Sequence, residues 1–248
     1  MKPFFSALSF LTPVRVPASW SGGERELARS LYYFPIVGLL IGGVAAAICF
    51  GLGRVLPPLA VAAFVVCALI AASRGLHVDG LSDTSDGLFS SRPREQMLVI
   101  MRDSHVGAMG VIAIVCVIVV KTALLASVDS GAALWRMVLL MPVAGRCAMV
   151  TSMAVFRYAR PEGGLATVFA VTGGRRWALL IWPLVVIFSI GWLLAGLEGV
   201  VAAAASVVTG MLAGAYCRRR LGGYTGDTLG ATNELVEIMP ALVAALWV

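Results

Sequence analysis

The sequence predicts an all-α protein, a polytopic integral membrane bundle of about seven transmembrane helices in a single domain over residues 1–248. The chain is 60% hydrophobic and only 13% of its residues are charged, which is about half the charged fraction of a soluble domain. Its mean hydropathy is +0.93. Several uncharged runs approach the ~20 residues that a helix needs to cross a hydrocarbon core. These runs are continuous rather than alternating, which excludes an outer-membrane barrel.

The apolar runs locate the individual spans, each near the crossing length. They are expected at residues 31–53, 57–74, 107–128, 132–154, 177–196, 199–217 and 229–247. The last is the least regular because Glu234 and Glu237 lie in it, so a re-entrant end after the sixth span is the alternative. Before the first span, Pro13 and Arg15 interrupt a short apolar stretch. We therefore expect residues 1–17 to be a retained interfacial or re-entrant segment rather than a signal peptide.

The distribution of basic residues predicts the orientation. If the N-terminus is cytoplasmic, fifteen of the 19 lysines and arginines fall in cytoplasmic segments and only Arg54 falls outside. This asymmetry follows the positive-inside rule. It also accounts for the net charge of +6 without a nucleic-acid partner. The long polar stretches 75–106, 157–176 and 218–228 then all face the cytoplasm, so we expect the chemistry on that side.

The stretch "HVDGLSDTSDGLFSSRPRE" places three carboxylates close together, at Asp79, Asp83 and Asp86. Asp83 and Asp86 follow Asp79 by four and seven residues, a spacing that puts all three on one helix face. Like charges on one face repel unless a cation lies among them. Hard carboxylate oxygens suit Mg²⁺, which also binds substrate phosphates. His77, two residues before Asp79, is a candidate general base.

A second acidic stretch is "GGYTGDTLGATNELVE", residues 222–237. Asp227 follows Thr225 and Gly226 in a glycine-rich segment, and we expect it to contact metal or phosphate. Glu234 and Glu237 lie within a predicted span, where ionisable groups are costly and usually functional. Two interpretations remain open for them: they contact substrate, or they pair with Arg136, Arg146 or Lys121 for structural reasons.

Two further stretches hold candidate substrate contacts. In "MRDSHVGAMG", Arg102, Asp103 and Ser104 precede the third span, and the Arg102 guanidinium is suited to grip phosphate oxygens. His105 in the same stretch is more typical of a structural histidine. Arg146 in "PVAGRCAMV" lies deep in a span, where it could bind an anionic substrate or neutralise a carboxylate. Carboxylates, arginines and glycines at one membrane face predict a metal-dependent reaction on a phosphorylated substrate.

Five stretches together resemble the successive motifs of the cobalamin synthase (adenosylcobinamide-GDP ribazoletransferase) family: "GLHVDGLSDTSDGLF", "MRDSHVGAMGV", "PVAGRCAMV", "ARPEGG" and "GGYTGDTLGATNELVE". The opening "LSFLTPVRVP" is also similar to that family. The matches run in order to residue 237 and cover nearly the whole chain. Arg74 and His105 depart from the family pattern, and the second departure argues against a catalytic role for His105.

The resemblance implies a bacterial inner-membrane enzyme that requires Mg²⁺. It implies transfer of the adenosylcobinamide phosphate from adenosylcobinamide-GDP to α-ribazole or its 5′-phosphate, with release of GMP. Asp79, Asp83, Asp86 and Asp227 are then expected to hold the metal. Catalytic roles are expected for His77, Asp83 and Asp86. Substrate contacts are expected at Arg102, Asp103, Ser104, Arg146, Thr225, Gly226, Glu234 and Glu237.

Two other classes stay as alternatives. A CDP-alcohol-type membrane phosphotransferase does related chemistry, but its full motif spacing is absent. A cation-coupled secondary transporter would place its carboxylates near the bilayer midplane on broken helices within repeats, and no repeat is visible. The lipid bilayer is an expected partner in every case. Whether the protein forms a homo-oligomer is left open by the resemblance.

Overall fold

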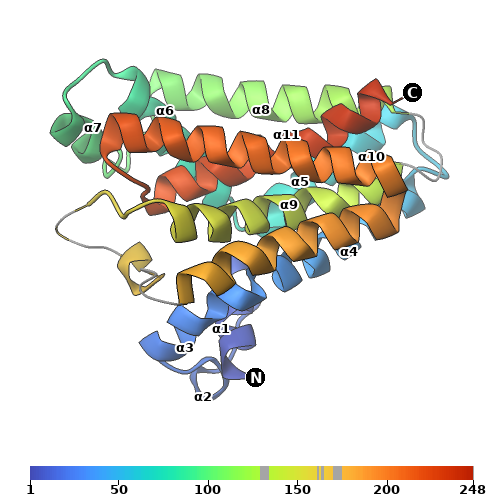
Figure 1. The fold of residues 1–248 in the computed structure, drawn as a ribbon. Coiled ribbons are helices and arrows are strands. Elements are labelled where there is room, and N and C mark those ends of the chain that lie inside the picture. The colour runs from blue at the N-terminus through green and yellow to red at the C-terminus, as the bar shows by residue number, and fades with distance from the viewer. Residues whose placement is uncertain (129–133, 161, 163–164, 170–174, 248) are drawn as a thin grey trace.

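A computed structural model describes residues 1–128, 134–160, 162, 165–169 and 175–247. The described chain is almost entirely helical (Figure 1). The helices are α1 (Lys2–Leu11), α2 (Ala18–Ser21), α3 (Glu24–Arg29), η1 (Ser30–Tyr33), α4 (Phe34–Leu52), α5 (Pro58–Ala72), α6 (Leu76–Phe89), α7 (Arg94–Ile100), α8 (Ala108–Ser127), α9 (Leu134–Val155), η2 (Leu165–Phe169), α10 (Arg175–Leu221) and α11 (Gly226–Leu246).

Five of the described helical segments are long and apolar enough to cross a membrane, and six are if the bent pair α5–α6 counts as one span. The five are Glu24–Leu52, Ala108–Ser127, Leu134–Val155, Arg176–Leu221 and Gly226–Leu246. Each run predicted from hydropathy contains a helix. The fold class, a polytopic helical membrane protein, is therefore confirmed.

Helix α10 contains two of the predicted spans. Its 47 residues are interrupted by non-helical backbone at Ala195 and Gly196, close to the predicted boundary between residues 196 and 199. At 1.5 Å per residue a straight helix of this length would be about twice as long as the hydrocarbon core is thick. The chain instead doubles back at this point, and Figure 1 shows two arms running in opposite directions.

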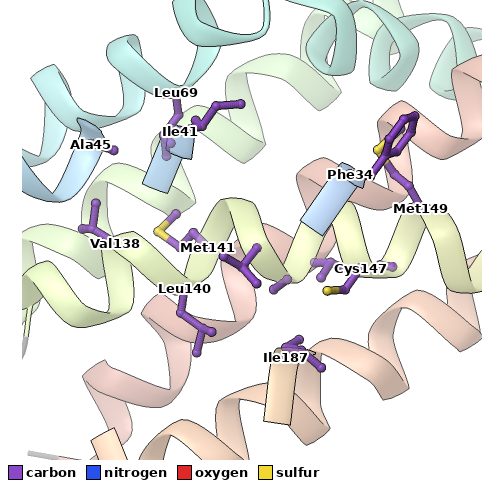
Figure 2. Packing of buried hydrophobic residues seen from close by; sticks show 14 of the residues in the cluster. Phe34, Ile41, Ala45, Leu69, Val138, Leu140, Met141, Cys147, Met149 and Ile187 are labelled. Carbon is purple, nitrogen blue, oxygen red and sulfur yellow. The ribbon is translucent and has the colours of Figure 1, made fainter. Parts of the chain in front are cut away.

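Helix α9 is the centre of the bundle. In its most apolar stretch 89% of the residues are buried, compared with 22% for α8, because α9 packs against α4, α10 and α11. Ile41 and Ala45 of α4 lie beside Val138 and Met141 of α9 in the hydrophobic core (Figure 2). Gly42 permits this approach, since a Cβ atom there would collide with the backbone of Leu139.

Helix α6 does not continue the direction of α5. The two helices meet at an angle of 88°, and Gly75 between them has a φ of +72°, which is accessible to glycine at little cost. With 14 residues, α6 is too short to cross a bilayer alone, and we place it outside the spanning segments. It packs against α8 and α11 and so carries the Asp-rich stretch to the start of α11.

Candidate active site

Helices α4, α6 and α11 begin, and α9 ends, at one end of the bundle (Figure 1). A cavity of about 220 Å³ lies among these helix ends. Six segments far apart in the sequence meet there: α1, α4, α6, α9, α11 and the chain after α9. Its lining residues are Phe10, Phe34, Leu76, His77, Asp79, Gly80, Met149, Met153, Tyr158, Arg160, Phe169, Gly226, Asp227, Leu229 and Gly230.

Helices α6 and α11 bring the two acidic stretches together. A Cβ atom on Gly80 would lie 2.7 Å from the carbonyl oxygen of Asp227, and one on Gly230 would lie 3.1 Å from that of His77. Only glycine permits backbones to approach so closely. Asp79 and Asp227, 148 positions apart in the sequence, therefore line the same cavity.

Asp83 lies one helical turn beyond Asp79 and is half-buried. Burial first, and then the negative charges of Asp79, Asp227 and Asp86, raise the pKa of Asp83 from 3.8 to about 7. Such a shift is typical of carboxylates that share a site without a neutralising cation. The electrostatics of this end of α6 therefore favour a positively charged ligand.

Asp86 has a different environment from the other two aspartates of α6. Both of its carboxylate oxygens accept backbone hydrogen bonds, from Gly107 N and Gly110 N at 2.8 Å each. These amides belong to the unsatisfied donors at the start of α8, where a carboxylate is also favoured by the helix dipole. Asp86 thus caps α8 and ties it to α6. A role in metal binding or catalysis stays a prediction.

The aspartates provide the donor chemistry for Mg²⁺, since Asp79, Asp83 and Asp227 offer hard oxygen ligands. Among the described residues, no three His, Cys, Asp or Glu side chains form a ready-made metal site. Asp227 is instead neutralised by Arg160, with Nη2 2.6 Å from Oδ2. After burial, the neighbouring carboxylates contribute to the raised pKa of Asp83; a divalent cation fits among these charges, and these three side chains would hold it.

Arg160 is the cavity residue that sequence reasoning assigned only to the general excess of cytoplasmic arginines. Backbone hydrogen bonds fix its position: Ala159 N donates to Tyr224 O and Tyr224 N donates to Arg157 O, each at 2.8 Å. Arg94 strengthens the junction by donating to the carbonyl oxygen of Ala159 at 2.7 Å. The short pairing places Arg160 beside Asp227. The "ARPEGG" motif, which contains Arg160, was the feature of the sequence that could have identified this residue as part of the site.

Four charged side chains form a closed cluster behind the cavity. Lys121 Nζ lies 2.7 Å from Glu234 Oε2 and 2.8 Å from Glu237 Oε2. Arg146 pairs with the second oxygen of Glu237, which also accepts from Asn233 Nδ2 at 3.0 Å. The two carboxylates and two cations balance, and all four side chains are almost fully buried. Of the two interpretations left open for Glu234 and Glu237, the structure displays the pairing, and their contact with substrate stays a prediction.

His77 connects this ion cluster to the cavity. Its Nδ1 lies 3.4 Å from Arg146 Nη2, and burial together with the Arg146 charge lowers the pKa of His77 well below 6.5. The imidazole is therefore neutral. Because a guanidinium has only donors, Nδ1 accepts and the proton resides on Nε2. Within the described chain, this buried Nε2 has no hydrogen-bond partner.

The other predicted site residues divide between the cavity and an exposed loop. Thr225 caps α11 and donates to Asp227 Oδ2 at 3.2 Å, and Gly226 lines the cavity. Arg102 pairs with Glu162 at 3.1 Å on the surface. Asp103 and His105 pair at 2.6 Å, which lowers the pKa of Asp103 and raises that of His105. Three exposed residues are not among those that line the cavity: Arg102, Asp103 and Ser104. Their contact with substrate stays a prediction.

The fold and the site define a polytopic helical membrane protein in which aspartates and an arginine from distant helices meet at one end of the bundle, an arrangement typical of a membrane-embedded enzyme. The chain belongs to the cobalamin-5-phosphate synthase family, whose family model matches residues 3–245. The family expected from the sequence motifs is confirmed.

Three relatives illustrate the likeness, and all are named adenosylcobinamide-GDP ribazoletransferase. The protein from Acetivibrio thermocellus is 37% identical over 95% of this chain and 94% of its own length. The protein from Desulforamulus reducens is 38% identical over 93% of this chain and 91% of its own length. The protein from Escherichia coli is 38% identical over 96% of this chain and 97% of its own length. No solved structure matches.

The charge balance of the ion cluster leads to a stability prediction. In Lys121→Met two buried carboxylates share one cation, and breaking a buried ion pair in this way costs about 3–5 kcal/mol. We expect a much lower melting temperature in detergent. The double variant Lys121→Met/Glu234→Gln restores neutrality and should recover most of the loss. A single variant as stable as the wild type would contradict the structural role of the cluster.

Proposed function

We propose that this chain transfers the adenosylcobinamide phosphate from adenosylcobinamide-GDP to α-ribazole or its 5′-phosphate and releases GMP. The observation that carries this proposal is the family match along almost the entire chain, with relatives of that name covered over more than nine-tenths of their length. The match favours this reaction over the lipid phosphotransferase and the secondary transporter.

The reaction needs three things from the protein. An acceptor ribose hydroxyl must approach the phosphorus attached to the corrinoid, its proton must be removed, and negative charge on the departing GMP must be stabilised. The new bond joins the ribose oxygen to that phosphorus, and the bond from the same phosphorus to the GMP oxygen breaks. Positioning and charge stabilisation dominate the catalysis of such transfers.

The cavity residues match these needs. Arg160, held at the rim by the Tyr158–Tyr224 pairing, can exchange Asp227 for a phosphate oxygen, since a guanidinium binds either group through two parallel hydrogen bonds. Bound Mg²⁺ would neutralise the diphosphate, with Asp79, Asp83 and Asp227 as its ligands. The sequence left His77 or a carboxylate as the base. Because Nδ1 of His77 faces Arg146, an aspartate of α6 is the better proton acceptor.

We also propose that the protein lies in the bacterial inner membrane with the cavity facing the cytoplasm. The polar segments on α6, after α9 and before α11 lie at the same end of the bundle (Figure 1), and most basic residues gather there.

The proposed reaction predicts that Asp83 and Asp227 act as a unit. Asp83→Ala and Asp227→Ala should each reduce GMP release by about 10²-fold or more, and the double variant should be little worse than either, because residues of one charge-stabilising unit are not additive. Glu95→Ala removes an exposed carboxylate of α7 and serves as the control. Multiplicative losses with an unchanged Mg²⁺ requirement would rule out a shared site.

The raised pKa of Asp83 predicts that Mg²⁺ binding depends on pH. With a pKa of about 7, the carboxyl is mostly protonated at pH 6 and mostly charged at pH 8, so Mg²⁺ should bind about tenfold tighter at pH 8. Calorimetry on the purified protein in nanodiscs measures this directly. Asp83→Asn should bind weakly and without this pH dependence, whereas equal wild-type affinity at both pH values would argue against the metal role of Asp83.

The orientation is tested independently by cysteine labelling in a variant lacking the exposed Cys67 and Cys116. A cysteine at Ser91, between α6 and α7, should react with an impermeant maleimide only from the cytoplasmic side. A cysteine at Arg54, in the connection between α4 and α5, should react only from outside. The reverse pattern would invert the topology and place the cavity on the outer face.

A further inference from the structure

Three phenylalanines and two methionines line one part of the cavity. Phe10 of α1, Phe34 of α4 and Phe169 of η2 contact one another, with ring centroids 5.3–6.0 Å apart. Met149 and Met153 of α9 contribute two thioethers, and Figure 2 shows Met149 beside Phe34. Aromatic rings and thioether sulfur make favourable contacts with a flat aromatic ligand.

Two buried donors of residues that line the cavity, His77 Nε2–H and Arg160 Nε–H, have no hydrogen-bond partner in the described chain, and the first belongs to an uncharged side chain. The Nε2–H of His77 is a donor without a partner in the described chain, and the side chain is only 1% exposed. An unsatisfied buried donor is unfavourable, and a ligand that places one acceptor opposite Nε2 would satisfy it. Arg146 fixes this tautomer through Nδ1, and Glu237 and Lys121 hold Arg146 in place.

The size of the cavity limits what can enter. Its volume of about 220 Å³ is below the ~300–1,000 Å³ typical of sites for whole drug-sized ligands. A corrinoid macrocycle is larger than this volume, whereas a fused bicyclic ring is of suitable size. The candidates within the proposed reaction are therefore the guanine of the donor and the aromatic base of the acceptor.

Polarity separates these two bases. Guanine presents several donors and acceptors along its edges, and the part of the cavity formed by the phenylalanines and methionines offers no side-chain hydrogen-bond partners for them. An N-glycosylated benzimidazole has one polar ring atom, its unsubstituted nitrogen, which accepts a single hydrogen bond. This single acceptor can pair with His77 Nε2–H, which leaves the Nε–H of Arg160 for an anionic group such as a phosphate.

We propose that this cavity binds the benzimidazole-type base of the acceptor nucleoside, with His77 Nε2–H donating to the unsubstituted ring nitrogen. This inference rests on the proposed function and names the part of the acceptor that the cavity recognises. The base lies among the three phenylalanines and two methionines. Its ribose points toward Asp227 and Arg160, whose side chains are 23% and 13% exposed, so the attacking hydroxyl is held near the aspartates.

The hydrogen bond is tested by removing its acceptor from the ligand. GMP release in vesicles is measured with a benzimidazole riboside and with the matching indole riboside, in which a C–H replaces the ring nitrogen. The wild type should have an acceptor KM about tenfold higher for the indole compound, the value of one hydrogen bond. His77→Phe should accept both compounds to within twofold. Equal KM values in the wild type would overturn the proposal.

A second pair of variants tests the cavity without disturbing the ion cluster. Met149→Trp fills the space and should raise the acceptor KM at least tenfold while leaving the KM for the corrinoid donor unchanged. Leu212→Trp introduces the same side chain at an exposed position of α10 outside the cavity lining; it is the control and should retain both values. A rise in the donor KM instead would place the guanine in the cavity and overturn the inference. A wild-type protein that releases no GMP at all would contradict the proposed function itself, whereas transfer without discrimination between the ribosides contradicts only this inference.

Discussion

The crossing of α6 over α11 is the contact on which the site depends. Gly80 and Gly230 lack side chains where the two backbones meet, and this absence brings Asp79 and Asp227 to one cavity. A larger residue at either position would separate the helices and their carboxylates. Helix α6 can lie in this direction because the chain bends by 88° after α5. The positions of the site carboxylates therefore depend on these backbone contacts and on the bend after α5.

The buried ion cluster stabilises the same region from behind. Helices α8 and α9 each contribute one cation and α11 contributes two carboxylates, so the charges balance within the cluster. Buried ion pairs add little net stability over apolar packing, but they penalise any arrangement that separates the partners. In this chain they fix the three helices relative to one another and, through Arg146, orient the imidazole of His77. The contact between Arg146 and His77 therefore connects the buried ion cluster to the cavity.

Hydropathy predicted the fold well because crossing a bilayer demands long apolar helices, a constraint visible in any stretch of sequence. Helical phasing likewise grouped Asp79 and Asp83. Long-range partners were harder to predict. Arg160 reaches Asp227 only through a two-residue backbone pairing, and the phenylalanines of the cavity come from three separate helices. Asp86 has the spacing of a metal ligand, a role that stays a prediction, and its carboxylate also caps α8, a contact that local phasing does not reveal.

We propose that aspartates from α6 and α11 form one diphosphate site. A structure of the protein in nanodiscs with Mg²⁺ and a non-hydrolysable analogue of the GDP-activated corrinoid tests it most directly. We expect a metal ion bound by Asp79 or Asp83 together with Asp227, and a phosphate oxygen on Arg160. A diphosphate bound at the Arg102–Glu162 surface pair, with Asp227 still paired to Arg160 and no metal between α6 and α11, would contradict it.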